Sequence, residues 1–449
     1  MLRRQLGALS VIHAKSAAGQ MLNPEKSKAR ALAGSIHNDG QRRRWTLQRF
    51  AAGIMADKVE RIGKDGQCRP HFVYRVAMCH RGTDGGAPAI KRSADRINAR
   101  YTGLQTCASV WHCPICAPKV AQVRKAEMNE AIQAHKKAGG EVYFATYTRQ
   151  HDAESGGAGS LPDALKGLSK ALSGVKGNRG YREAMAAAGS IGAIRGFEVT
   201  YGEINGWHPH AHELIFAAPG NLAQLRRSIR SQWCRLLVRR GLAGLKLGDI
   251  GRDRFRKLRD LYRRAFTLQA GDYAAEYVAK FGREPEGERG SWGIASEITR
   301  SHLKRGRGPL DGAPQRCAHA SPWALLNDAL DGDQRSRVLW REYAEAMQGK
   351  RQLFWSRGLR VHFFGIAERT DDDIAAAADS RCTEHVCELG PIEWQTVIAH
   401  DARFDVLRIA ALSGAAAVHD YIEKLGESPP THSGNYQESS AIFLMRRAA

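Results

Sequence analysis

The sequence predicts an α+β fold with several helices and an antiparallel pair of strands. Residues 119–138 carry apolar side chains at helical spacing and end at two glycines. The segments 141–148, 191–201 and 207–216 are rich in β-branched and aromatic residues, as strands are. Asn205-Gly206 precedes the last segment, and this dipeptide is a strong hairpin signal. The last two segments are therefore expected to pair antiparallel.

The composition is that of a basic globular protein. The chain has 449 residues, with 68 Lys and Arg against 46 Asp and Glu, for a net charge of +22. This excess excludes an acidic chaperone-like protein and favours an anionic partner, nucleic acid first and a membrane surface second. The sequence contains no run of about 18 consecutive apolar residues, so we expect no membrane-spanning helix. The nine cysteines are too sparse for a disulfide scaffold, which favours a reducing compartment.

The chain divides into five expected parts. Residues 1–60 are predicted to form a basic, mobile N-terminal arm, and 68–120 a small Cys-rich metal module. Residues 121–290 are expected to form the catalytic domain. The Gly, Pro and Arg content of 291–320 is typical of a linker. Residues 321–449 are predicted to be a mostly helical C-terminal region without an assigned role.

Lysine and arginine concentrate between residues 226 and 264, where fourteen of them stand against three Asp. A solvated helical face and a surface that tracks phosphates both account for this imbalance. Four aromatic residues stand among or beside these charges, and stacking on bases or a place in the core is open to each. They are Trp233, Phe255, Tyr262 and Phe266.

Three histidines alternate along the expected strand 207–216. His208, His210 and His212 therefore share one face of that strand. Two histidines with a carboxylate suit Mg²⁺, Mn²⁺ or another divalent ion that keeps positions open for phosphate. A set of solvated surface histidines is the alternative interpretation.

The third ligand is sought on the preceding strand, at Glu198. A two-residue turn would pair Val199 with His212 and send Glu198 to the opposite face. A three-residue loop over 204–206, with Gly206 in the left-handed region, would pair Glu198 directly with His212. We expect the second register because it brings a carboxylate to the metal. A solvent-facing Glu198 is the alternative.

A second candidate group stands on the expected helix 271–281. Tyr273, Tyr277 and Lys280 are spaced i, i+4, i+7, so they form one helical stripe. Two phenols and an ammonium can serve phosphoryl transfer where a metal polarises the phosphate and the lysine offsets charge in the transition state. A core stripe ending in a solvent-reaching lysine is the alternative.

Clustered cysteines predict a structural zinc site. The expected ligands are Cys79, Cys107, Cys113 and Cys116. Four thiolates suit tetrahedral Zn²⁺, with Cys68 or His112 as substitutes for Cys79. A Cys-x-x-Cys redox pair is the alternative. The remaining cysteines (Cys234, Cys317, Cys382 and Cys387) are expected to be ordinary thiols.

Together these segments resemble the HUH endonuclease superfamily, in particular the Rep proteins that start rolling-circle replication of plasmids and some phages. His210-Ala211-His212 is similar to the His-hydrophobic-His element of that superfamily. Tyr277–Lys280 is similar to its Tyr-x-x-Lys motif, and Tyr273 to the extra nucleophile of two-tyrosine members. The run from Cys107 to Cys116 resembles the cysteine motif upstream in many plasmid Rep proteins. The resemblance covers roughly residues 70–370.

The resemblance implies an HUH-like antiparallel sheet of about five strands, backed by helices, with the histidine strand central. It implies that a metal held by His210, His212 and Glu198 polarises a phosphate of single-stranded DNA. Tyr277 would attack, leaving a 5′-phosphotyrosine and a free 3′-OH, so that rejoining needs no ATP. Tyr273 would be a second nucleophile, assisted like Tyr277 by Lys280. His208 would be a further ligand or a proton shuttle.

The implied protein is a bacterial, cytoplasmic nicking and joining enzyme that initiates plasmid replication. It would use Mg²⁺ or Mn²⁺ in catalysis and Zn²⁺ for structure, and it would act on plasmid origin DNA that is single-stranded at the nick. A host helicase and DNA polymerase would be partners, since the chain has no P-loop; no membrane is implied, and the oligomeric state stays open. The alternatives are an HUH transposase or relaxase, a non-catalytic zinc-dependent nucleic-acid-binding protein, and a metal-dependent hydrolase that forms no covalent adduct.

Overall fold

The computed structural model describes residues 40–63, 65–149, 160–203, 206–220, 222–245, 248–270, 319–366, 368–377 and 381–430. The chain divides by its contacts into Met1–Arg43 and Arg44–Ala449, and the fold given below is that of the second unit. Within the described ranges, no helix has the length and apolar character that crossing a membrane requires. The candidate residues Tyr273, Tyr277 and Lys280 lie outside these ranges, as does most of the expected linker.

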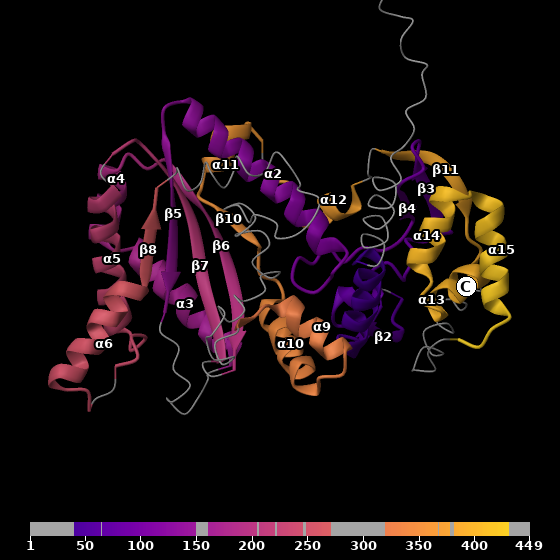
Figure 1. The fold of residues 1–449 in the computed structure, drawn as a ribbon, viewed down its shortest axis with the longest axis horizontal. Helices are drawn as coiled ribbons and strands as arrows, with labels where there is room; N and C mark the ends of the chain where they lie inside the picture. The colour runs from indigo at the N-terminus through magenta and orange to yellow at the C-terminus, as the bar shows by residue number, and fades with distance from the viewer. Residues whose placement is uncertain are drawn as a thin grey trace, which may run out of the picture. The chain divides into compact units, whose positions relative to one another are not determined.

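An antiparallel sheet forms the centre of this unit (Figure 1). Its strands are β5 (Glu141–Thr148), β6 (Gly192–Gly202), β7 (Gly206–Ala217), β8 (Phe266–Gln269) and β10 (Leu353–Trp355), in the order β10-β6-β7-β5-β8. The short β9 (His319–Ala320) pairs with the end of β6. The expected α+β fold with a five-stranded antiparallel sheet is therefore confirmed, and the histidine strand β7 is its middle strand.

Helices cover both faces of the sheet because its strands bury side chains on both sides. They are α2 (Cys116–Lys137) and α11 (Leu359–Phe364) on one face, and α3 (Leu161–Lys176), α4 (Arg179–Ala187) and α5 (Leu222–Arg239) on the other (Figure 1). Neighbouring residues of β5 show how side chains alternate between the two faces of the sheet. Phe144 belongs to the apolar cluster under α2, and Tyr143 to the cluster under α3 and α5. A further helix, α6 (Gly251–Arg264), packs against α5 and leads into β8.

The edge strand β10 corrects the expected domain boundaries. It comes from the region 321–449, which was expected to be separate from the domain 121–290, yet it pairs with β6. Ser356, directly after β10, places its hydroxyl 2.9 Å from the backbone N of Ala193. An uncovered β6 would expose a row of unpaired N–H and C=O groups, and this later segment satisfies them.

A second, three-stranded sheet joins two segments that lie far apart in the sequence. It consists of β3 (Ala89–Ser93), β4 (Ala99–Thr102) and β11 (Cys382–Glu388), covered by α13 (Pro391–Ala399), α14 (Arg403–Leu412) and α15 (Ala415–Gly426). The hydroxyl of Tyr101 on β4 donates to the carbonyl of Arg403 at 2.9 Å. The C-terminal region therefore contributes strands to both sheets, which the prediction of a mostly helical region did not include.

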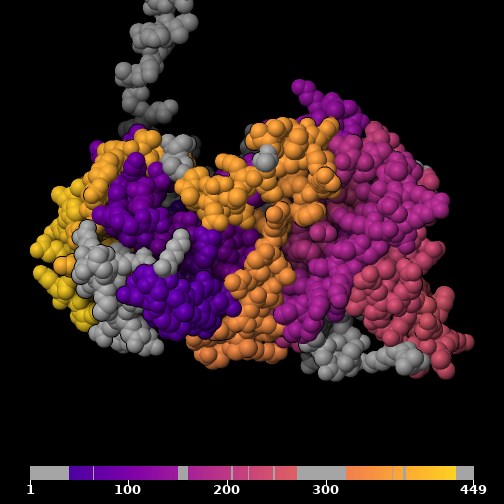
Figure 2. All heavy atoms as spheres, turned by 180° about the vertical axis from the view of Figure 1, so that it is seen from behind, coloured from indigo at the N-terminus to yellow at the C-terminus, as the bar shows by residue number. Residues whose placement is uncertain are grey.

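The remaining elements lie between the two sheets. They are β1 (Lys58–Ile62), β2 (Cys68–Phe72), η1 (Arg75–Met78), α9 (Pro322–Leu330), α10 (Gln334–Met347) and α12 (Asp371–Ala376). Figure 2 shows the orange segment that includes α9 and α10 between the indigo and magenta parts of the chain. Residues 44–54 are helical and bury Leu47, Ala51 and Ile54 against this region. The expected mobile arm over 1–60 is wrong for this stretch, because its apolar residues follow a helical period.

Candidate active site

The three histidines of β7 project from one face of the central sheet. Across the strand, Thr148 of β5 is paired with His210 and Thr146 with His212. The rings of His208 and His210 have centroids 3.9 Å apart, and those of His210 and His212 are 6.2 Å apart. The alternation of a strand thus gathers three imidazoles and two hydroxyls into one group.

Glu198 joins this group, but in a different register from the expected one. It is paired with His210, and Gly196 is paired with His212. Gly202 is paired with Gly206, so the register lies two residues away from the expected one, and Gly206 has the left-handed φ of +69°. Glu198 still lies on the sheet face of the histidines after a shift of two residues, because side chains alternate along a strand with a period of two. The carboxylate consequently reaches diagonally, and its Oε2 lies 2.6 Å from Nε2 of His212.

This pair is buried. Glu198 and His212 each retain 4% of their exposed surface, and their contact satisfies two polar groups that burial removes from water. The ring of Phe144 stacks on His212 at 5.2 Å with an interplanar angle of 9°, which covers one face of the imidazole. His210 and His208 are only partly buried, so the group opens toward solvent on their side.

Two threonines of β5 hold the other nitrogen of each ring. Oγ1 of Thr148 lies 3.0 Å from Nδ1 of His210, and Oγ1 of Thr146 lies 3.1 Å from Nδ1 of His212. The Nε2 atoms are thereby turned away from β5. Nε2 of His212 faces Glu198, and Nε2 of His210 lies 3.1 Å from Nδ1 of His208. Sequence reasoning missed both threonines, although they alternate within 141–148 in the same way as the histidines do.

The donor set fits a divalent cation. Two imidazole nitrogens and one carboxylate oxygen on one face form a set that suits such an ion and leaves positions open for a phosphate. Ligating histidines ordinarily bond through their second nitrogen to an outer group that fixes ring orientation. Thr146 and Thr148 occupy that outer position for His212 and His210.

The histidine strand is also anchored on its opposite face. Trp207 donates from Nε1 to Oε2 of Glu342 at 2.9 Å, and the backbone N of Leu161 donates to Oε1 at 2.8 Å. One carboxylate of α10 therefore joins the start of β7 to the first turn of α3, where backbone N–H groups lack helical partners. This tie limits movement of the strand that carries the imidazoles.

The four cysteines expected to bind zinc come together at the start of α2. Their sulfur atoms all lie within 4.8 Å of one another, and all four side chains are buried. Sγ of Cys79 is 3.6 Å from that of Cys113 and 3.5 Å from that of Cys116. A tetrahedral zinc with Zn–S bonds of about 2.3 Å separates its sulfurs by about 3.8 Å, close to these values.

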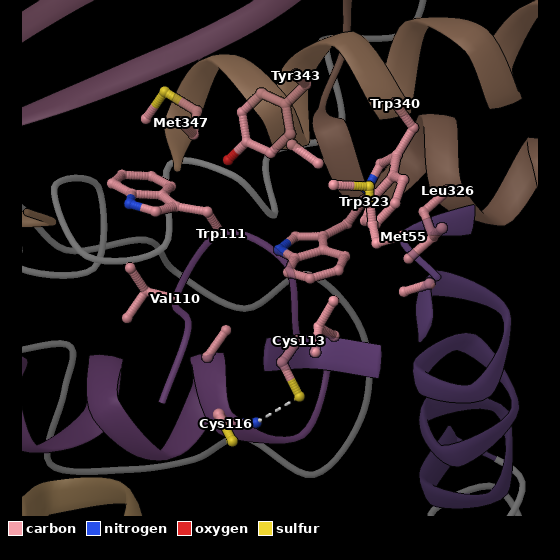
Figure 3. Close-up of a cluster of buried hydrophobic side chains, with 14 of the residues drawn as sticks. Met55, Val110, Trp111, Cys113, Cys116, Trp323, Leu326, Trp340, Tyr343 and Met347 are labelled. Atoms are coloured by element: carbon pink, nitrogen blue, oxygen red, sulfur yellow. Dashed lines mark hydrogen bonds between the residues drawn. The ribbon is translucent and has the colours of Figure 1, made fainter. Parts of the chain in front are cut away.

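Backbone amides support the same arrangement. The N–H of Cys116 donates to Sγ of Cys113 at 3.4 Å, drawn as a dashed line in Figure 3, and the N–H of Cys107 donates to Sγ of Cys79 at 3.3 Å. Figure 3 also shows Cys113 and Cys116 beneath the aromatic residues Trp111 and Trp323. Burial raises the pKa of the Cys113 thiol, whereas hydrogen bonds from the other three thiols lower the pKa of Cys116.

The other candidates for this cluster lie elsewhere. Cys68 is exposed and contacts Glu60, and Nε2 of His112 lies 2.7 Å from the carbonyl oxygen of Ala344. Burial raises the pKa of the Cys234 thiol to about 11, as expected for an ordinary buried thiol. Cys317 lies outside the described residues.

The basic segment 226–264 forms most of α5 and all of α6. Trp233 and Phe266 are fully buried and belong to the core. Phe255 is 69% exposed, and Tyr262 lies beneath the guanidinium of Arg230 at 5.3 Å. Of the four aromatic candidates for base stacking, the described surface therefore offers Phe255 and, in part, Tyr262.

Comparison with known proteins finds curated relatives of this chain. No family model matches the chain. A curated relative named Protein rep, from Streptomyces lividans, is 27% identical over 341 residues, which cover 62% of this chain and 68% of that protein. This chain is similar to that Rep protein along most of its length. A neomycin resistance protein of Streptomyces cyanogenus is 33% identical to this chain over 134 residues, and these span 25% of this chain and 30% of that protein.

A solved structure that resembles this chain is a viral domain. It is the N-terminal nuclease domain of non-structural protein 1 of minute virus of mice, with 12% identity and a TM-score of 0.19. The similarity covers 48% of this chain and 98% of the viral one.

Proposed function

We propose that this chain is a Rep protein that cuts and rejoins single-stranded DNA at a plasmid origin and thereby initiates rolling-circle replication. The observation that carries the proposal is the contact between Glu198 and His212, with His210 beside it on the same strand face. Kinship to a Protein rep supports a replication initiator. The net charge of +22 supports a nucleic-acid substrate.

His210, His212 and Glu198 would hold the catalytic ion, Mg²⁺ or Mn²⁺. When bound, such an ion polarises the scissile phosphate and neutralises charge that develops on its oxygens. Thr146 and Thr148 hold the two imidazoles in the orientation that ligation needs. His208, next to His210, is placed to act as a further ligand or to accept a proton from the attacking group.

Tyr277 is the proposed nucleophile. Its phenolic oxygen bonds to phosphorus and loses its proton, the bond from phosphorus to the 3′ oxygen breaks, and that oxygen leaves as a protonated 3′-OH. The 5′ side of the strand stays on the enzyme as a phosphotyrosine, so the reverse attack by a 3′-OH rejoins DNA without ATP. Lys280 would offset negative charge in the transition state, and Tyr273 would serve as a second nucleophile at termination.

The topology of the sheet supports the position of the tyrosines. Gln269 at the end of β8 is paired with Phe144, whose ring stacks on His212. The chain therefore leaves the sheet one strand away from the histidines. Tyr277 lies eight positions after Gln269, and a chain of eight steps reaches at most about 29 Å. Tyr277 is thus within reach of a phosphate held at His210 and His212.

The cysteine cluster has a structural role in this proposal. Zn²⁺ held by Cys79, Cys107, Cys113 and Cys116 would fix the first turn of α2, which then crosses the sheet face that carries the histidines. Zinc binding contributes directly to folding energy in loop-rich segments such as 103–115.

The cut would leave a 3′-OH that a host DNA polymerase extends, and a host helicase would separate the strands.

The test uses single-stranded oligonucleotides that tile both strands of the DNA flanking the coding sequence. Each is labelled at its 3′ end and incubated with the full chain and Mn²⁺. We expect one oligonucleotide to give a band that remains attached to protein on a denaturing gel. His210→Ala should abolish this band, whereas His385→Ala, an exposed strand histidine on the other sheet, should leave it unchanged.

Two results would overturn the proposal. Cleavage that leaves no protein–DNA band under any metal would indicate a hydrolase. Equal nicking by wild type and His210→Ala would remove the histidine face from the reaction.

A further inference from the structure

Helix α6 is covered by the rest of the protein along one narrow side only. Of its fourteen residues, Leu261 is buried and most others are exposed. Phe255 is 69% exposed, which is unusual for a phenylalanine on a helix that already packs against α5 and β8. The helix thus presents most of its circumference to solvent, including an apolar side chain.

Four arginines form a continuous stripe on the outward side of this helix. Arg252, Arg256, Arg259 and Arg263 follow one another at spacings of four, three and four residues, and all four are exposed. At 100° per residue they fall on the side opposite Leu261. The stripe is about 16 Å long, since eleven residues rise about 1.5 Å each.

These arginines are scarcely neutralised by neighbours. Arg256 lies 3.2 Å from Asp253 in an exposed pair, which is worth little energy. Arg252, Arg259 and Arg263 have no ion-pair partner among the residues that the structure describes. Arg254 and Arg264 are likewise exposed but lie on the Leu261 side of the helix, within about 60° of that residue. Like charges in one row repel one another and destabilise an isolated helix. Solubility alone therefore does not account for this arrangement, since scattered charges would provide it without that repulsion.

The shape favours duplex DNA over a single strand. A major groove about 12 Å wide admits an α-helix, and arginine bonds in bidentate fashion to guanine O6 and N7 on its floor. A helix open around most of its circumference meets that geometry. Single-strand binding needs successive exposed aromatic rings, and α6 offers Phe255 with a half-covered Tyr262.

The position of α6 relates this surface to the histidines. Ala265, which ends the helix, accepts a hydrogen bond from the backbone N of Thr148 at 2.8 Å. The side chain of the same threonine contacts His210. A duplex along α6 therefore ends close to the strand end that carries the imidazoles.

We propose that α6 enters the major groove of duplex DNA, reads guanine-containing sequence with its arginine stripe, and places that duplex beside the strand to be cut. Placement of the duplex beside the strand to be cut rests on the proposed function, whereas duplex recognition by α6 does not. Phe255, adjacent to the stripe, would contact a thymine methyl group.

The test begins with selection from a pool of 40-base-pair duplexes that carry a randomised core. We expect the full chain to enrich one guanine-containing sequence. The stripe variant, Arg252→Gln, Arg259→Gln and Arg263→Gln together, should bind that sequence on the order of 100-fold more weakly, because each lost bidentate contact has a large effect on affinity. Its selection from the same pool should return no consensus.

A second variant tests whether the stripe, rather than the charge of the helix as a whole, reads the sequence. Arg254→Gln with Arg264→Gln removes two exposed arginines on the Leu261 side of α6, so it should retain the consensus. The matched control removes three exposed charges elsewhere, with Lys166→Gln, Lys170→Gln and Arg182→Gln on α3 and α4. We expect it to retain the consensus. Each substitution introduces glutamine, a good helix former. Melting temperatures equal to that of the wild type confirm that the variants are folded.

The inference is overturned if the stripe variant selects the same sequence with wild-type affinity. It is also overturned if a single strand of the selected sequence competes as well as the duplex. Nicking of tiled single strands is measured in parallel. Loss of duplex selection with intact nicking supports both proposals, whereas absence of nicking in wild type with stripe-dependent selection removes only the proposed function.

Discussion

Oε2 of Glu198 on β6 lies 2.6 Å from Nε2 of His212 on β7, although the two residues are not direct cross-strand partners. The carboxylate reaches diagonally past His210, its direct cross-strand partner, to the next imidazole on the same face of β7. Both partners are nearly fully buried, so this contact keeps two polar groups satisfied away from water.

We predict that Glu198→Gln lowers Mn²⁺ affinity by about 10- to 100-fold, because the neutral amide is a poorer ligand for a hard cation. The measurement is a titration of the full chain with Mn²⁺, followed by the loss of the free-ion EPR signal. Glu203→Gln, an exposed glutamate at the end of the same hairpin, is the matched control and should bind as wild type does. Equal affinity in both variants would show that Glu198 holds no metal.

Thr148→Val removes the hydroxyl that holds Nδ1 of His210 while keeping the shape of the side chain. We predict a loss of metal affinity of about 10-fold or more, since outer partners orient ligating histidines. Thr148→Ser should restore it. Isothermal calorimetry with Mn²⁺ measures both, and Thr383→Val, on an exposed edge of the second sheet, is the control. Failure of serine to rescue would assign the effect to packing.

Metal removal tests the cysteine cluster. We predict close to one zinc per chain by elemental analysis and a melting temperature about 10 °C lower after strong chelation, because the loop-rich segment loses its folding energy. Cys113→Ser should abolish zinc and Cys68→Ser, an exposed thiol, should not. A zinc-free protein of full stability would contradict the structural role.

Glu342 ties α10 to the histidine strand and to α3. We predict that Glu342→Ala destabilises the fold by about 2–3 kcal/mol, because the buried Trp207 N–H and the Leu161 N–H both lose their acceptor. Urea unfolding measures the change. Glu345→Ala, one turn later in an exposed ion pair, should cost under about 1 kcal/mol. Similar losses in the two variants would deny Glu342 this role.

Local sequence patterns were sufficient for several elements. The segment 141–148 coincides with β5, and alternation alone placed the three histidines on one face. Register was harder, because it depends on which loop residues the hairpin excludes, and the expected loop was misplaced by one position at each end. The face of Glu198 survived this error, since the resulting shift of two residues is a whole period of a strand.

Long-range pairing explains the other differences. Nothing within residues 353–355 indicates that they cover the edge of β6, and nothing within 382–388 indicates pairing with β3. The roles of Thr146 and Thr148 depend on β5 lying next to β7, which strand order decides and local periodicity does not. The cysteine set was easier, because thiolate spacing within 107–116 is itself a local signal.

The central claim is that the imidazoles of β7 and the phenol of Tyr277 act on one phosphodiester. Its most direct test is peptide mapping of the covalent protein–DNA species by mass spectrometry after nuclease trimming. We predict a nucleotide on the peptide that contains Tyr277, lost in Tyr277→Phe or moved to Tyr273. A nucleotide on a peptide from any other part of the chain would contradict the account.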